Sequence, residues 1–183
     1  MSFDLADFSY SRQRPQTRVV DEIRHFTISV RSQTIGLPVD CVKTIFYLDK
    51  LTPVPLAPPE VAGLANLRGR IVTALYLDRC LRIDSDEDQR QSLLAVGITH
   101  NGEDYALIVD DTGDVIVSEN ADRISCPAHL DPDVVGLMSG CYRYDGGFLS
   151  IIDIASLIKR VSQQCNATHG VGAARNSTKG AGQ

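Results

Sequence analysis

Apolar residues alternate with polar ones along much of the chain, which is the two-residue period of strands buried on one face. One alternating stretch at residues 26–30 is followed, after a polar turn, by a second at 35–39. Another pair, at 94–98 and 105–109, flanks Asn101-Gly102, the preferred centre of a tight turn between two strands. The alternation therefore predicts two β-hairpins and an all-β body.

Helical patterns are short and local. Asp40 can cap a short helix in which Val42, Ile45 and Phe46 share one face. Residues 154–159 open a C-terminal helix whose apolar positions recur at helical spacing, namely Ile154, Leu157, Ile158 and Val161. We expect small connecting helices and one C-terminal helix around the strands.

The chain also contains an internal repeat. Residues 59–64 (PEVAGL) return at 132–137 (PDVVGL), and residues 71–77 (IVTALYL) correspond to 148–154 (FLSIIDI). Between the paired segments lies a turn, at 67–70 in the first copy and a longer one at 142–147 in the second. Two such units predict two small barrels that share an interface, since neither would bury enough surface alone. Chance resemblance between segments rich in Val, Gly and Leu is the alternative.

Length and composition limit the other classes. The chain has 183 residues and a net charge of -5, and it lacks Trp, so nothing attracts nucleic acid and base-stacking platforms are not expected. No apolar run approaches the roughly 20 residues of a membrane-spanning helix, and no signal peptide is evident, which predicts a cytoplasmic protein. Residues 1–22 are expected to form a flexible leader and residues 166–183 a disordered tail.

Candidate catalytic groups are sparse. Four histidines lack metal-site spacing, and neither a nucleophile elbow nor a phosphate loop occurs, so we expect no metal and no cofactor. The five cysteines form an odd set without C-x-x-C spacing, which favours reduced, structural thiols. Asp110-Asp111 and the acidic run at 84–88 are interpreted as turn and loop residues. A small enzyme using the Cys141 thiol or a carboxylate pair remains the alternative.

Arg68 stands between two apolar segments, at the centre of the turn of the first repeat. An arginine displayed on a rigid turn can form bidentate bonds with a partner's carboxylate or carbonyl groups. It can equally be a solvated turn cation that contributes little. Spacing alone leaves both interpretations open.

Residues 63–72 (GLANLRGRIV) resemble the G-x-x-N-L-R-G-x-I-V signature of CheW-like domains, found in bacterial chemotaxis coupling proteins and in the regulatory domain of the CheA histidine kinase. The resemblance covers about residues 24–160, and we expect a CheW-like domain at 23–161. It implies two intertwined SH3-like, five-stranded β-barrels. It also implies a non-catalytic adaptor that couples the cytoplasmic hairpin tips of chemoreceptors to a CheA-type kinase in signalling arrays.

The resemblance further suggests where partners bind. The receptor tip is expected near an apolar groove between the barrels, and the kinase on the barrel surfaces. The partner-binding residues carried over from the family pattern are Asn66, Leu67, Arg68 and Gly69, with Val42 and Thr44 on a partner-facing segment. Three residues depart from the pattern: Thr44 replaces a common acidic residue, Thr73 a frequent Pro and Tyr76 a frequent Asp. The loss of a charge at position 44 suggests a specialised receptor or kinase, or a pathway other than flagellar taxis.

Overall fold

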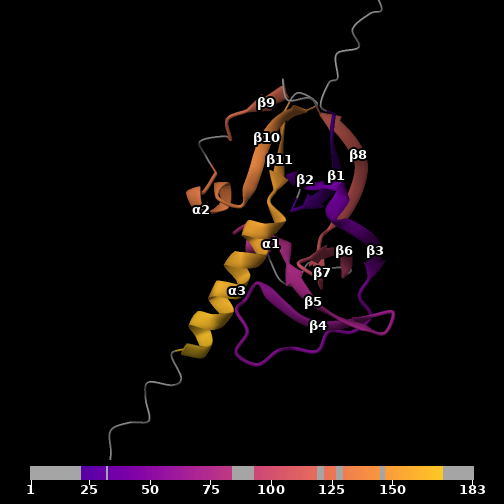
Figure 1. Cartoon of the computed structure of the whole chain (residues 1–183), viewed down its shortest axis with the longest axis vertical. Coiled ribbons are helices and arrows are strands. Elements are labelled where there is room, and N and C mark those ends of the chain that lie inside the picture. Colours follow the sequence, from indigo (N-terminus) through magenta and orange to yellow (C-terminus); the bar gives the residue numbers. More distant parts are fainter. Residues whose placement is uncertain are drawn as a thin grey trace, which may run out of the picture.

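The computed structural model describes residues 22–31, 33–83, 93–118, 122–126, 130–144 and 147–170. Within them the chain forms two β-sheets, which lie one above the other in Figure 1. The first unit has the strand order β8 (Asp111–Ser118), β1 (Ile23–Val30), β2 (Gln33–Pro38), β11 (Gly147–Ile152), β10 (Met138–Tyr144) and β9 (Arg123–Ile124). The second unit has the order β3 (Val42–Tyr47), β6 (Leu94–His100), β7 (Glu103–Ile108), β5 (Arg70–Tyr76) and β4 (Val61–Leu67).

Four helical segments are defined within the described part of the chain, and all but the last are short. They are η1 (Val39–Cys41), α1 (Leu77–Cys80), α2 (Pro132–Val135) and α3 (Ile154–Gly170). The start of α3 is fixed by Asp153, whose Oδ1 accepts hydrogen bonds from the backbone N–H of Ala155 at 2.9 Å and of Ser156 at 3.2 Å. None of the helices among the described residues is long and apolar enough to span a bilayer. The all-β, two-unit prediction is confirmed.

Both predicted hairpins are present. In the β1–β2 hairpin Val30 pairs with Gln33, and in the β6–β7 hairpin His100 pairs with Glu103. Asn101 and Gly102 have φ angles of 50° and 83°, as a type I′ turn requires, and such a turn matches the twist of the strands beside it. Local turn chemistry therefore fixes the register of the second hairpin.

The two units follow one plan. In each, two hairpins meet through a parallel pair of strands, β2 with β11 and β5 with β7, while the other strand pairs are antiparallel. The first unit is built from both ends of the described chain, and the second from the segment between them. The path of the chain therefore intertwines the two units.

The largest core cluster belongs to both units. It joins Ile28 and Leu37 of the first sheet to Leu75 and Leu107 of the second, and Leu157 of α3 packs into it; all five side chains are fully buried. Each fully buried side chain of this size contributes roughly 1.5–3 kcal/mol. The interior of each unit holds a smaller cluster of its own. The shared interface is therefore the main core, and neither unit is an independent domain.

Arginines add polar contacts across this interface. The Arg31 guanidinium, in the β1–β2 turn, lies 3.5 Å from the Asp78 carboxylate of α1, and both side chains are largely buried. The Arg160 guanidinium on α3 donates to the carbonyl of Cys80. A buried ion pair of this kind fixes how elements meet more than it adds to stability.

Three sequence predictions were wrong in detail. Residues 42–47 form strand β3 rather than a helix, because Asp40 starts only the short η1 and the apolar residues after it pair with β6. The first sheet has six strands rather than five, because β9 adds a two-residue edge. Residues 166–170 belong to α3 rather than to a tail, because the packed helix extends through residues that tolerate helical geometry. Residues 1–21, 84–92 and 171–183, which hold the leader, the acidic run and the rest of the tail, lie outside the described residues.

The predicted correspondence between residues 71–77 and 148–154 agrees with the structure, whereas that between residues 59–64 and 132–137 does not. Val61 pairs with Leu75 in one hairpin and Met138 with Ile152 in the other, and a bulge follows each pair at a glycine, Gly63 or Gly140. Residues 59–64 thus enter a strand, whereas 132–135 form α2, where the Asp131 side chain caps the helix by accepting from the Asp133 N–H. The strand pairing of the two hairpins ends at Leu67↔Arg70 and at Tyr144↔Gly147, which are equivalent positions of the repeat.

We predict that His25 makes stability fall in mild acid. His25 is 3% exposed, its Nε2 lies 3.0 Å from the Ser118 hydroxyl, and its ring lies 5.2 Å from that of Tyr142. Burial lowers the pKa of this imidazole below its ordinary value. Because the unfolded chain binds the proton more readily, stability is full above about pH 6.5 and is lost as the pH falls below it.

Urea unfolding between pH 7.5 and 5.5 checks this prediction. The wild type should lose more free energy of unfolding over this range than a folded His25→Phe variant, which keeps the ring contact but cannot be protonated. Equal pH dependence of the two proteins would contradict it.

Candidate functional site

The Asn-Leu-Arg-Gly segment forms the β4–β5 hairpin turn. Arg68 and Gly69 have φ angles of 52° and 85°, which is again the type I′ geometry. The Asn66 side-chain oxygen accepts a hydrogen bond of 2.8 Å from the Gly69 N–H and braces the turn. Leu67 packs in part against the core of the second unit. Asn66, Leu67 and Gly69 therefore hold the backbone, and Arg68 is left exposed at the tip.

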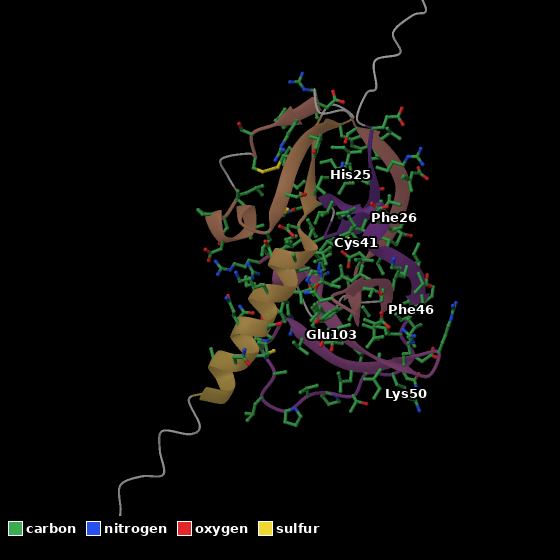
Figure 2. All side chains as sticks on the ribbon, viewed as in Figure 1. His25, Phe26, Cys41, Phe46, Lys50 and Glu103 are labelled. Carbon is green, nitrogen blue, oxygen red and sulfur yellow. A yellow bond between two sulfur atoms is a disulfide. The ribbon has the colours of Figure 1, made fainter. Side chains whose placement is uncertain are left out.

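The turn lies beside the end of β3, which Phe46 and Lys50 mark in Figure 2. A depression of 450 Å³ separates residues 46–50 from residues 65–68. Tyr47, Lys50 and Arg68 line it, and Ile45 lies two residues before Tyr47 on the same face of β3. We call Ile45, Tyr47, Lys50 and Arg68 the hairpin surface.

Val42 and Thr44 lie on the other face of β3. Both are half-buried, and Val42 packs against the shared core. Thr44 lies over Gly97 of β6, where an added Cβ would come within 2.8 Å of the Thr44 methyl group. Sequence reasoning instead missed Ile45 and Tyr47, which are 46% and 67% exposed. The alternation of Ile45 and Tyr47 with Thr44 and Phe46 could have identified an exposed strand face, but the segment was predicted to be a helix.

A larger groove of 710 Å³ lies between the units. Leu81, Arg82 and Ile83, which follow α1, form one side, and the first unit and α2 form the other. Its apolar wall consists of Ile35, Leu81, Ile83, Leu130, Val134, Met138 and Phe148. We call these seven residues the inter-unit groove. A groove of this size with an apolar wall suits the apolar face of a helix.

Charged side chains brace the rim of this groove. The Arg82 guanidinium lies 2.9 Å from the Asp131 carboxylate and 2.7 Å from that of Asp133. The Asp131 carboxylate accepts from the Asp133 backbone N–H and pairs with Arg82, and both interactions lower its pKa. The three residues tie α2 of the first unit to the segment after α1, so they hold the two sides of the groove together.

The carboxylates and the cysteine that a small enzyme would use for catalysis make structural contacts instead. The Asp110 carboxylate accepts from the Arg31 backbone N–H, and Asp111 accepts from the Thr112 N–H at 2.8 Å, so both residues shape turns. Cys141 forms a disulfide with Cys126 and has no thiol to attack a substrate. Within the described residues no three His, Cys, Asp or Glu side chains gather where they could hold a metal ion.

The expectation of five reduced thiols was therefore wrong for one pair. Cys126 follows β9 and Cys141 lies in β10, and the β9–β10 pairing brings their Cα atoms to 5.4 Å, within the range a disulfide needs. The spacing along the chain gave no sign of this contact, because it depends on an unpredicted two-residue strand. Cys41, Cys80 and Cys165 are free, and burial raises the pKa of Cys80 to about 12.

Comparison with known proteins decides the family. A model of the CheW-like domain matches residues 24–162, most of the chain. The chain belongs to the CheW-like domain family. Its relatives include proteins named chemotaxis protein CheW from Thermotoga maritima, 26% identical over 79% of this chain and 95% of the relative, and from Bacillus subtilis, 25% identical over 74% and 86%.

A solved structure shows the same fold. The scaffolding protein TtCheW from Thermoanaerobacter tengcongensis superposes with a TM-score of 0.64 at 22% identity, over 74% of this chain and 91% of that one. Family membership makes the chain a non-catalytic adaptor of the chemotaxis coupling type. The small-enzyme alternative is not favoured.

We predict that the glycine that opens the signature, Gly63, is needed to place the hairpin. Gly63 has φ +144°, and an added Cβ would lie 2.6 Å from the Thr52 carbonyl oxygen. Thr52 exchanges two backbone hydrogen bonds with Leu64 there, so the backbone cannot easily move away. Gly63→Ala should lower the free energy of unfolding by about 2 kcal/mol or more.

Gly69→Ala is the matched control, because Gly69 also has a positive φ but nothing lies within 4 Å of an added Cβ. It should cost about 1 kcal/mol. Urea unfolding of both variants compares the two costs. A Gly63→Ala variant no less stable than Gly69→Ala would show that the close approach to Thr52 does not matter.

Proposed function

We propose that this protein couples the cytoplasmic hairpin tips of chemoreceptors to the regulatory domain of a CheA-type histidine kinase, in the cytoplasm and within signalling arrays. The observation that carries the proposal is the braced hairpin that presents Arg68, the residue at the centre of the family signature. An adaptor needs two separate surfaces, and the hairpin surface and the inter-unit groove provide them.

The hairpin surface suits a folded β partner such as the kinase regulatory domain. Tyr47 and Ile45 offer apolar area on strand β3, and Lys50 and Arg68 add positive charge beside it. Aromatic and arginine side chains are the residue types that dominate binding energies at protein interfaces. The turn holds the Arg68 backbone before the partner arrives, which reduces the entropy lost on binding.

The inter-unit groove suits a helical hairpin such as the receptor tip. Phe148 is 37% exposed, and with Met138 and Ile83 it offers apolar area in a concave site. A helix lays its apolar face into such a groove through residues three and four positions apart. Because the groove is formed by both units, a helix bound there would contact both.

Val42 and Thr44 lie on the inner face of β3, beneath the hairpin surface, and belong to the proposed site. They support the strand whose outer face carries Ile45 and Tyr47, and their own side chains are half-buried. We infer that Thr44 influences partner choice through the position of β3 over Gly97 and through the absence of a charge there.

The first test of this function is Arg68→Glu. The side chain is exposed at a turn, so the fold should survive, while capture of the kinase fragment, the partner proposed for the hairpin surface, should weaken about thirtyfold or more, as expected for a central binding residue. Lys159→Glu on α3 is the matched control, because it changes the net charge equally at another exposed position. Isothermal titration with each fragment measures the effect. Unchanged binding of both fragments by folded Arg68→Glu would exclude Arg68 from the site.

A second test separates the two surfaces. Phe148→Asp places a charge in the apolar wall of the groove and should weaken receptor binding by about tenfold or more, while kinase binding stays within twofold. Val115→Asp on the exposed face of β8 is the control, since Val115 is more exposed than Phe148 and does not line the groove. Equal losses for both partners in the same titrations would contradict the division into two surfaces.

A further inference from the structure

A disulfide between Cys126 and Cys141 closes the β9 end of the first sheet, and its yellow bond is visible beside β9 and β10 in Figure 2. Cys126 lies two residues after β9, and Cys141 lies within β10. The bond therefore joins the edge segment of residues 122–126 covalently to the strand beside it.

Non-covalent contacts hold the rest of that segment. Strand β9 has two residues, and they pair with Cys141 and Tyr142 of β10. The Arg123 guanidinium also donates a hydrogen bond of 2.9 Å to the Ser139 carbonyl. An edge strand this short is weak without a further restraint. The disulfide is thus the strongest link between residues 122–126 and the sheet.

The two sulfur atoms differ in accessibility. Cys126 is partly exposed, whereas Cys141 is fully buried, with its Sγ 3.5 Å from the Ser150 hydroxyl. A thiolate in solution can therefore reach the Cys126 Sγ, and the Cys141 sulfur is the leaving group beside a hydroxyl that can donate to it. Accessibility of one sulfur is what distinguishes disulfides that exchange from those that stay inert.

We propose that Cys126 and Cys141 form a reversible thiol–disulfide switch that fastens and releases the β9 edge of the first sheet. In reduction by a small dithiol, its thiolate attacks the Cys126 Sγ, the S–S bond breaks, and the Cys141 sulfur leaves with the bonding electron pair and takes up a proton as it leaves. The second thiol of the reductant then displaces Cys126 from the mixed disulfide. The protein gains two electrons and two protons, and the reductant becomes a cyclic disulfide; a disulfide oxidant reverses the exchange.

Three other cysteines among the described residues are free thiols. Cys80 is fully buried, and burial raises the pKa of its thiol to about 12, so it does not form the thiolate that exchange requires. Cys41 and Cys165 are partly buried, and burial also raises the pKa of Cys41. In the cytoplasm proposed above, cysteine pairs that oxidise are transient and redox-sensing rather than structural. The exchange itself does not depend on the adaptor role, so an experiment can contradict the switch without contradicting the proposed function.

The experiment equilibrates the full-length protein with reduced and oxidised dithiothreitol at graded ratios, alkylates free thiols and maps the disulfides by peptide mass spectrometry. Hydrogen exchange is measured on both end states. We expect one two-electron transition, assigned to Cys126 and Cys141. In the reduced state, amides of residues 122–126 and the β10 edge should exchange about tenfold faster, equivalent to about 1.4 kcal/mol of lost protection.

Two serine variants serve as controls for this experiment. Cys126→Ser, at the more exposed position, should show the fast exchange of the reduced state at every ratio, and Cys165→Ser should keep the wild-type transition. A Cys126–Cys141 bond that does not form under oxidised dithiothreitol would overturn the proposal. So would one that excess reductant cannot break in the folded protein, or equal hydrogen exchange in the two states.

Discussion

The parallel pairing of β2 with β11 is the contact on which the rest of the architecture depends. Ile35 and Gly36, near the start of the described chain, pair with Ser150 and Ile151, near its end. Gly36 lies where an added Cβ would meet the Ile151 side chain, so the glycine leaves room for that side chain beside the paired strands. Because β2 and β11 pair in the first unit, the chain between these two strands leaves that unit and later returns to it. The second unit is formed by this intervening segment, and its own parallel pair of β5 and β7 repeats the arrangement of the first unit.

Both proposed binding surfaces follow from this topology. The two units must pack on each other, because their largest hydrophobic cluster is shared, and the line along which they meet leaves the inter-unit groove. The β4–β5 hairpin lies at the β4 edge of the second sheet, so its turn can present Arg68 without disturbing the core. The proposed surfaces thus lie where the two units meet and where the β4–β5 turn comes beside the end of β3. The second hairpin shares the register of the first but lacks the Asn-Leu-Arg-Gly turn, which makes the two units unequal.

Local signals predicted the parts of the fold that local chemistry decides. Asn101-Gly102 specified its turn, and alternation specified the strands beside it, so both hairpins were predicted with their partners. Residues 42–47 were mistaken for a helix, because apolar residues at that spacing fit either period and only pairing with β6 decides between them. The first half of the repeat was misaligned because Asp131 caps a helix where its counterpart enters a strand. In the site, Arg68 was identified correctly as an exposed turn residue, and an apolar groove between the units was expected from the family resemblance. The outer face of β3 and the disulfide were missed, because they depend on contacts between distant segments.

The proposed function requires that the protein hold both partners at once, on surfaces formed by different parts of an intertwined fold. Sedimentation velocity of the protein mixed with a labelled kinase regulatory domain and a labelled receptor hairpin fragment measures whether it does. We expect a single species that carries both labels, and saturating receptor fragment should not displace the kinase domain. Displacement of one label by excess of the other partner would show that both compete for one surface, which would exclude simultaneous binding.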